Sequence, residues 1–280
     1  MTKEKLLLGL SDFLKEIPDP RQQSKIVYPL DEILLLSISA VVSGCTEWGE
    51  IVDFGEDKLA WLRQYRPFDN GIPAHDTLNR VMSLISPSTF SDMFVLWANR
   101  NLKLDSGTLV SIDGKRLRGS ATKEEQQLPR SSGGKSAAHL LEAWCNDLSV
   151  CMSVRQVESK TNEIKVVPSI LDDLALEGCV ISMDAMGCQK DIVKKICEGK
   201  ADYLIGLKGN QSTLASAVQQ AFTAFDAKKQ PLTEQNTGHG RIEERTCRVI
   251  KAQDVLQEAL TKEWTGLNAQ GRRMNVFLHI

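Results

Sequence analysis

The sequence of 280 residues lacks any uncharged apolar run near the roughly 18 to 20 residues that a membrane span needs. It also lacks an excess of charge of either sign, because 34 lysines and arginines face 36 aspartates and glutamates. Any nucleic-acid-binding surface must therefore be a local basic patch. The amino terminus lacks the apolar core and cleavage site of a signal peptide. These absences predict a cytoplasmic protein with no membrane partner.

Cysteine and histidine occur in patterns that disfavour two common kinds of site. The seven cysteines are odd in number and include no CxxC pair, which argues against a disulfide framework or a structural zinc site. The four histidines have no metal-ligand spacing. Gly133-Gly134-Lys135-Ser136 is similar to the end of a phosphate-binding loop, but Pro129 stands where that motif needs a glycine. A nucleotide hydrolase is therefore not expected.

The two halves of the chain differ in their apolar periodicity. Up to residue 103, apolar residues recur every three or four positions, which predicts a helical N-terminal domain. That domain is either a plain scaffold or a module for DNA binding or dimerisation. Over residues 104–267, β-branched runs alternate with helical patterns, which predicts an α/β domain built on a mixed sheet with flanking helices. A β-rich segment is expected near residues 231–263.

Two predicted strands each end in an aspartate, Asp113 and Asp184. Polar groups just beyond strand ends line the crevice where ligands bind in α/β sheets. Two carboxylates that meet there repel each other unless a cation lies between them, and hard oxygen ligands suit Mg2+ or Mn2+. A metal pair held in this way promotes phosphodiester attack. The alternative is that each aspartate only caps a helix or a turn.

Polar side chains near these strand ends are candidates for contacts with DNA phosphates. Lys115, Arg116 and Arg118 follow Asp113, where an anionic substrate would lie. Lys208 and Gln211 follow the predicted strand 203–207. Solvated loop residues, with Asn210 as a helix cap, are the alternative interpretation of the second group.

Several motifs resemble those of the H-repeat-associated family of insertion-sequence DDE transposases. Two of them surround the aspartates: Asp113-Gly114-Lys115-x-Leu117-Arg118-Gly119-Ser120 and Asp184-Ala185-Met186-Gly187-Cys188-Gln189. The others are Lys160-x-Asn162-Glu163-Ile164, residues 201–211, Asp19-Pro20-Arg21 and residues 72–80. The resemblance runs from about residue 10 to about residue 267, and its order-preserving matches make it specific.

The resemblance implies a ribonuclease-H-like catalytic domain in which Asp113 and Asp184 are the first two acidic metal ligands. The implied cofactor is Mg2+ or Mn2+. Similar proteins cut double-stranded DNA at the ends of an element and join the freed 3′ hydroxyl to a target, so both DNAs are the implied partners. A homo-oligomer is left open.

The resemblance ends before the third acidic ligand. In the family this ligand is in a C-terminal helix that reads roughly Arg-x-x-Trp-x-Ile-Glu-Asn, and residues 268–280 do not resemble it. This predicts a C-terminally truncated member with weak or no strand transfer. Glu243 is the candidate substitute ligand, although a solvated strand face explains it as well. Two functions therefore stay open: a transposase with impaired strand transfer, and an inactive remnant that only binds DNA or oligomerises.

Overall fold

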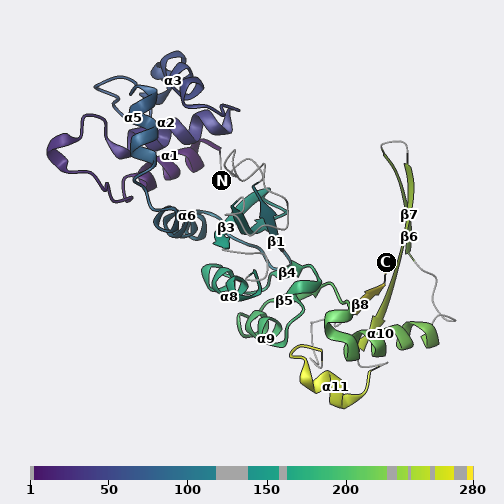
Figure 1. The fold of residues 1–280 in the computed structure, drawn as a ribbon. Helices are drawn as coiled ribbons and strands as arrows, with labels where there is room; N and C mark the ends of the chain where they lie inside the picture. The colour runs from purple at the N-terminus through teal and green to yellow at the C-terminus, as the bar shows by residue number, and fades with distance from the viewer. Residues whose placement is uncertain are drawn as a thin grey trace, which may run out of the picture. The chain divides into compact units, whose positions relative to one another are not determined.

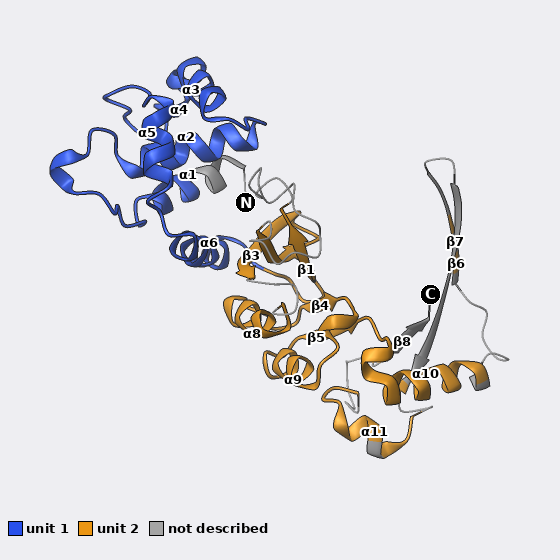
Figure 2. Cartoon of the chain, in the orientation of Figure 1, with its two compact units in different colours: residues 1–103 blue, residues 104–280 orange. Residues whose placement is uncertain are grey.

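The computed structural model describes residues 3–117, 138–157, 163–225, 232–238, 241–252, 256–267 and 276–279 (Figure 1). The chain divides into two compact units, residues 1–103 and residues 104–280 (Figure 2). The division falls where the apolar pattern of the sequence changes from a helical period to strand-like runs.

The first unit is made of helices packed around α2 (Leu30–Val42). Because α2 is apolar around most of its circumference, it becomes the buried helix of this unit. Ile33, Leu34 and Leu36 are completely buried, and α1 and α3 pack against the helix. The remaining helices are α1 (Lys3–Leu14), η1 (Gln23–Lys25), α3 (Trp48–Asp57), α4 (Leu59–Leu62), α5 (His75–Met82) and α6 (Pro87–Asn101).

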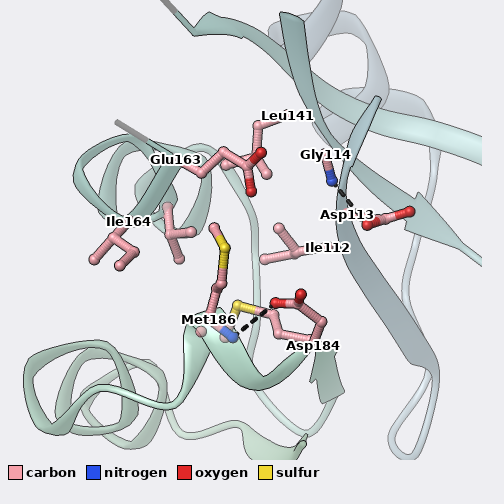
Figure 3. A pocket seen from close by; sticks show the side chains of 11 residues that line it. Ile112, Asp113, Gly114, Leu141, Glu163, Ile164, Asp184 and Met186 are labelled. Atoms are coloured by element: carbon pink, nitrogen blue, oxygen red, sulfur yellow. Dashed lines mark hydrogen bonds between the residues drawn. The ribbon is translucent and has the colours of Figure 1, made fainter. Parts of the chain in front are cut away.

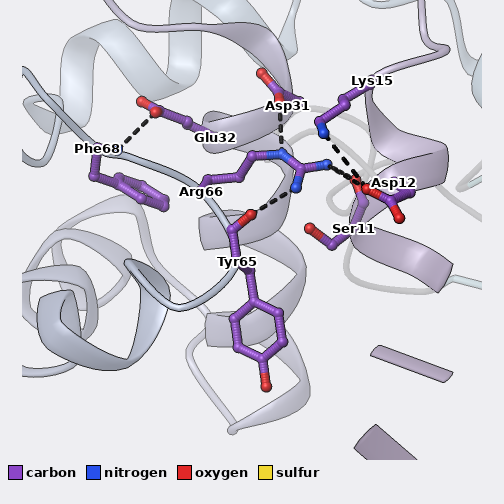
Figure 4. Close-up of polar contacts among 8 residues, drawn as sticks. All are labelled: Ser11, Asp12, Lys15, Asp31, Glu32, Tyr65, Arg66 and Phe68. Atoms are coloured by element: carbon purple, nitrogen blue, oxygen red, sulfur yellow. Dashed lines mark hydrogen bonds and ion pairs between the residues drawn. The ribbon is translucent and has the colours of Figure 1, made fainter. Parts of the chain in front are cut away.

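A buried arginine connects three segments of this unit (Figure 4). Only 6% of the Arg66 side chain is exposed, and its Nε donates to Asp31 Oδ2 on α2 at 2.7 Å. Its two terminal nitrogens donate to the backbone carbonyls of Tyr65 and Ser11. Each of the three guanidinium nitrogens therefore has a hydrogen-bond partner, as a buried charge requires.

Beside Arg66, the carboxyl group of Glu32 is almost entirely buried, with 4% of the residue exposed. One oxygen, Oε1, accepts a hydrogen bond from the Phe68 amide at 2.7 Å. The other oxygen, Oε2, has no hydrogen-bond partner among the described residues. Burial raises the pKa of Glu32, because the charged form loses its hydration.

The second unit is built on a five-stranded mixed sheet with the order β3-β2-β1-β4-β5. Strand β2 runs antiparallel to β1 and β3, whereas β1, β4 and β5 are parallel. Helix α8 connects β3 to β4, and α9 connects β4 to β5. This is a ribonuclease-H-like arrangement, so the predicted fold class is confirmed. The bounds are β1 (Leu109–Arg116), β2 (His139–Cys145), β3 (Val150–Val157), α8 (Glu163–Asp173), β4 (Val180–Met183), α9 (Lys190–Glu198) and β5 (Asp202–Ile205).

The core of this sheet comes from the alternation of its strands. In β1, Val110 and Ile112 are buried, while Leu109 and Ser111, which alternate with them, are partly exposed. Helix α8 packs on β2 and β3 and also contacts α9, so both helices lie on one face of the sheet. Their buried residues are Val167, Ile170, Leu171, Ile192, Val193 and Ile196.

Further elements follow the five-stranded sheet. Helix α10 (Ser212–Phe225) leads to a three-stranded sheet of β6 (Leu232–Gly238), β7 (Arg241–Lys251) and β8 (Val276–His279), with α11 (Glu258–Glu263) between β7 and β8. Strands β6 and β7 lie in the segment that the sequence predicts to be β-rich. Strand β8 lies within residues 268–280, the segment that does not resemble the family's C-terminal helix, and it pairs with the end of β7.

Among the helices that the structure describes, no single one has the length and apolar character to cross a membrane. Helices α5 and α6, bent relative to each other by 85°, pass that test only as a pair.

Candidate active site

Asp113 lies inside β1, and not at the end of a strand as the sequence suggests. The parallel pairing of β1 with β4 ends at Ile112, which lies opposite Met183. The antiparallel pairing with β2 continues as far as Arg116. Pairing with β2 therefore extends β1 past Asp113. The sequence of β1 alone does not reveal this pairing, because β2 is distant along the chain.

Asp184 is the first residue after β4, so it takes the position next to Asp113 on the neighbouring parallel strand. Adjacent strands are about 4.8 Å apart. Both residues are exposed, and both line one small cavity (Figure 3). Its volume is about 20 Å³, which is enough for one occupant the size of a water molecule or an ion. The structure thus brings the two predicted aspartates together.

Backbone amides orient both carboxylates, as the dashed lines in Figure 3 show. Asp113 Oδ1 accepts from the Gly114 amide at 2.9 Å, and Asp184 Oδ1 accepts from the Met186 amide at 2.9 Å. The second bond caps the short 3-10 helix η4 (Ala185–Gly187). The capping interpretation is thus correct for the local geometry of Asp184, and it does not exclude a ligand role for the other oxygen.

The donor chemistry of this cavity fits a hard divalent cation. Mg2+ is usually bound by one or two carboxylates and completes its shell with waters and substrate phosphates. Asp113 and Asp184 supply two such carboxylates. No group of three or more His, Cys, Asp or Glu side chains that could hold a metal occurs among the described residues.

The loop after β5 supports the segment that carries Asp184. The Gly206 amide donates to the Met183 carbonyl at 3.1 Å. Asn210, in the 3-10 helix η5 (Gly209–Gln211), donates through Nδ2 to the Ala185 carbonyl at 2.7 Å. Gln211 Nε2 donates to the Cys188 carbonyl at 2.8 Å, so its amide group has a structural partner. Lys208, which precedes η5, is exposed.

The cations that follow Asp113 differ in their surroundings. Lys115 forms an ion pair with Glu142 on β2, and the hydrogen bond between them raises the pKa of Lys115. Glu142 lies directly opposite Asp113 in the antiparallel register. Arg116 is exposed at the end of β1. Arg118 lies outside the described residues.

A third carboxylate in the wall of the cavity has no role predicted from the sequence. Glu163, the first residue of α8, lines the cavity together with Asp113 and Asp184 (Figure 3). It forms a close hydrogen bond through Oε1 with His139 Nε2. The signal that could have identified Glu163 is its place in one of the motifs that carry the family resemblance.

The predicted substitute ligand Glu243 lies on β7, in the three-stranded sheet, where its backbone pairs with Asn236. It is not among the described residues that line the cavity. Its side chain lies outside what the structure describes, so its ligand role stays a hypothesis.

Comparison with known proteins identifies the family. A model described as "DDE_Tnp_1-associated" matches residues 11–98, and one described as "Transposase DDE domain" matches residues 105–269. The second match covers more than half of the chain, and the chain therefore belongs to the family of transposases with a DDE domain.

Individual relatives agree with this assignment. "Putative transposase YncI" of Escherichia coli strain K12 is 41% identical over 240 residues, which are 85% of this chain and 94% of that protein. "H repeat-associated putative transposase YhhI" of the same strain is 38% identical over 272 residues, 93% of this chain and 68% of that protein. The resemblance to H-repeat-associated transposases is confirmed. The chain spans only 60% of the length of the YncI protein of E. coli O157:H7.

Proposed function

We propose that this chain is a transposase that carries out metal-dependent cleavage of insertion-sequence DNA, with impaired strand transfer. The observation that carries the proposal is the shared cavity of Asp113 and Asp184, at adjacent positions of a ribonuclease-H-like sheet in a DDE-family chain. The proposed cofactor is Mg2+ or Mn2+. We place the protein in the cytoplasm, since the six described cysteines are all free thiols.

Asp113 and Asp184 would hold the cation, and the amides of Gly114 and Met186 keep their carboxylates oriented before it arrives. A cation held there would supply the activation of a water or hydroxyl for attack on a phosphodiester and the stabilisation of the leaving oxygen. The bond from Asn210 to the Ala185 carbonyl holds the segment behind Asp184 in place. Preorganisation of this kind lowers the cost of assembling the site.

The proposed partners are the double-stranded DNA of the element ends and of the target. Arg116 and Lys208 are exposed, and we assign them contacts with phosphates, together with Arg118 and Gln211. Lys115 belongs to the same set, although a phosphate has to compete there with Glu142. Assembly as a homo-oligomer is part of this proposal.

A second candidate function is that of an inactive protein that only binds DNA or oligomerises. It is favoured by the absence of a three-residue metal cluster among the described residues. Glu243 is the proposed third ligand under the first function. If Glu243→Gln leaves the affinity for Mn2+ unchanged, Glu243 has no such role.

The test is Mn2+-dependent cleavage of a duplex that carries the ends of the element. Asp184→Asn should abolish cleavage and leave the protein folded, because asparagine caps a helix as well as aspartate does. The matched control is Asp172→Asn, which changes an exposed carboxylate on α8 and should cleave normally. Equal cleavage by Asp184→Asn would refute the proposal. No cleavage by an unchanged chain that is folded and binds the duplex would favour the second candidate.

A further inference from the structure

The pair formed by His139 and Glu163 lies beside the proposed metal site and has no part in the function derived so far. His139 begins β2 and Glu163 begins α8, so the pair connects the start of the strand to the start of the helix. Their side chains are only 12% and 13% exposed. A carboxylate desolvated to this degree is kept in place by its partner, because burial without a hydrogen bond would be costly.

The pair is packed directly on the backbone of Gly114. A Cβ atom built on Gly114 would lie 2.7 Å from Glu163 Oε1 and 3.0 Å from His139 Nε2. Real Cβ atoms essentially never approach other atoms closer than 3.0 Å. Only glycine therefore allows the strand and the pair to come this close.

Gly114 transmits this contact to Asp113. Its amide donates the hydrogen bond that orients Asp113 Oδ1, at 2.9 Å (Figure 3). A shift of the backbone at Gly114 moves this donor and therefore turns the carboxylate. The contacts thus run from Glu163 and His139 to Gly114, and from Gly114 to Asp113.

We propose that Glu163 and His139 are positioning residues that hold Gly114 so that its amide aims the Asp113 carboxylate at the metal. This inference rests on the proposed metal role of Asp113. Positioning fits the structure better than direct ligation, because Glu163 Oε1 is engaged by His139 and the described residues hold no three-residue metal cluster. Partners of this kind typically change metal affinity 10- to 100-fold when they are removed.

The test is the affinity for Mn2+ alone, followed by the electron paramagnetic resonance signal of the free ion. Glu163→Ala removes the packing on Gly114, and its affinity should fall by about 10- to 100-fold. Glu163→Gln keeps the volume and a hydrogen bond to His139, so its affinity should fall by less than about 10-fold, short of the loss in Glu163→Ala. Asp172→Asn, on the same helix, is the control and should not change the affinity.

The outcomes separate the alternatives. If Glu163→Gln loses as much affinity as Glu163→Ala, the charge itself binds the metal and the positioning role is wrong. If neither variant changes the affinity, the pair is only a packing contact and the inference fails. If Asp113→Asn still binds Mn2+ normally, it is the proposed function that fails. If Glu163→Ala does not fold, Gly114→Ala tests the same contact from the strand side and should lose affinity to a similar degree.

Discussion

The two units of this chain use charged side chains in opposite ways. In the helical unit, Arg66 and Glu32 are buried and Asp31 is largely shielded; the Arg66 guanidinium binds Asp31, and the Phe68 amide binds one oxygen of Glu32. In the sheet unit, Asp113 and Asp184 are exposed, and each accepts one amide hydrogen bond from its own segment. Charges of the first kind hold a fold together. Carboxylates of the second kind stay available for a ligand, so their removal should cost function more than stability.

The largest expected effect on stability breaks the interior network. Arg66→Met should lower the free energy of unfolding of the helical unit by up to about 3 to 5 kcal/mol, because Asp31, only 19% exposed, keeps a partly desolvated charge without its partner. Hydrogen exchange of peptides from residues 30–42 in the full chain measures the change in this unit alone.

Arg100→Met is the matched control, because the Arg100 and Glu16 side chains form an ion pair while 57% and 50% exposed. Exposed ion pairs of this kind contribute about 0 to 1 kcal/mol to the free energy of unfolding. If Arg66→Met costs no more than Arg100→Met, the contrast between interior and exposed charges does not hold.

A smaller effect compares two glycines, one in each unit. A Cβ atom on Gly55 in α3 would lie 2.9 Å from Leu36 Cδ1, and one on Gly114 would lie 2.7 Å from Glu163 Oε1. Overpacking costs about 1 to 3 kcal/mol. Gly55→Ala should be the milder change, because alanine returns up to about 1 kcal/mol of helix propensity at this position.

Urea denaturation and Mn2+ titration of both glycine variants sharpen the comparison. Gly114→Ala should weaken Mn2+ binding, whereas Gly55→Ala should leave it unchanged. A loss of Mn2+ affinity in Gly55→Ala would mean that the helical core and the cavity are not independent.

The smallest effect that we predict is a dependence of the stability on pH through Glu32. Since the pKa of Glu32 in the folded chain is raised above its usual value of 4.5, the folded chain binds more protons than the unfolded chain between the two values. The free energy of unfolding should therefore fall as the pH rises through this window. Glu32→Gln keeps an acceptor for the Phe68 amide and removes the titration, so its stability should fall less.

Urea midpoints from about pH 4.5 to about pH 8 measure this difference, which is a linkage effect. Glu16→Gln, a change of an exposed glutamate, is the control and should follow the unchanged chain. Parallel profiles for Glu32→Gln and the unchanged chain would show that Glu32 is not responsible.

The sequence predicts the elements better than the contacts between them. The helical character of the first unit and the strand before Asp184 follow from local patterns, and the resemblance implies the ribonuclease-H-like fold of the sheet. The position of Asp113 inside β1 depends on pairing with β2, which lies more than 20 residues away. The contact of Glu163 with Gly114 depends on the absence of a side chain at Gly114 and on where α8 packs on the sheet. Strand pairing and helix packing both join residues distant in the chain, so a local sequence pattern does not predict them.

The hydrogen bond from the Met186 amide to Asp184 has a consequence for how such a gene decays. Asparagine makes the same bond, so a change at this codon from aspartate to asparagine alters almost nothing that folding or proteolysis can sense. Under the proposed function, such a copy would be catalytically silent and would still accumulate as an intact protein. It would then compete with active copies for the same DNA ends, so that one substitution converts an enzyme into its own inhibitor.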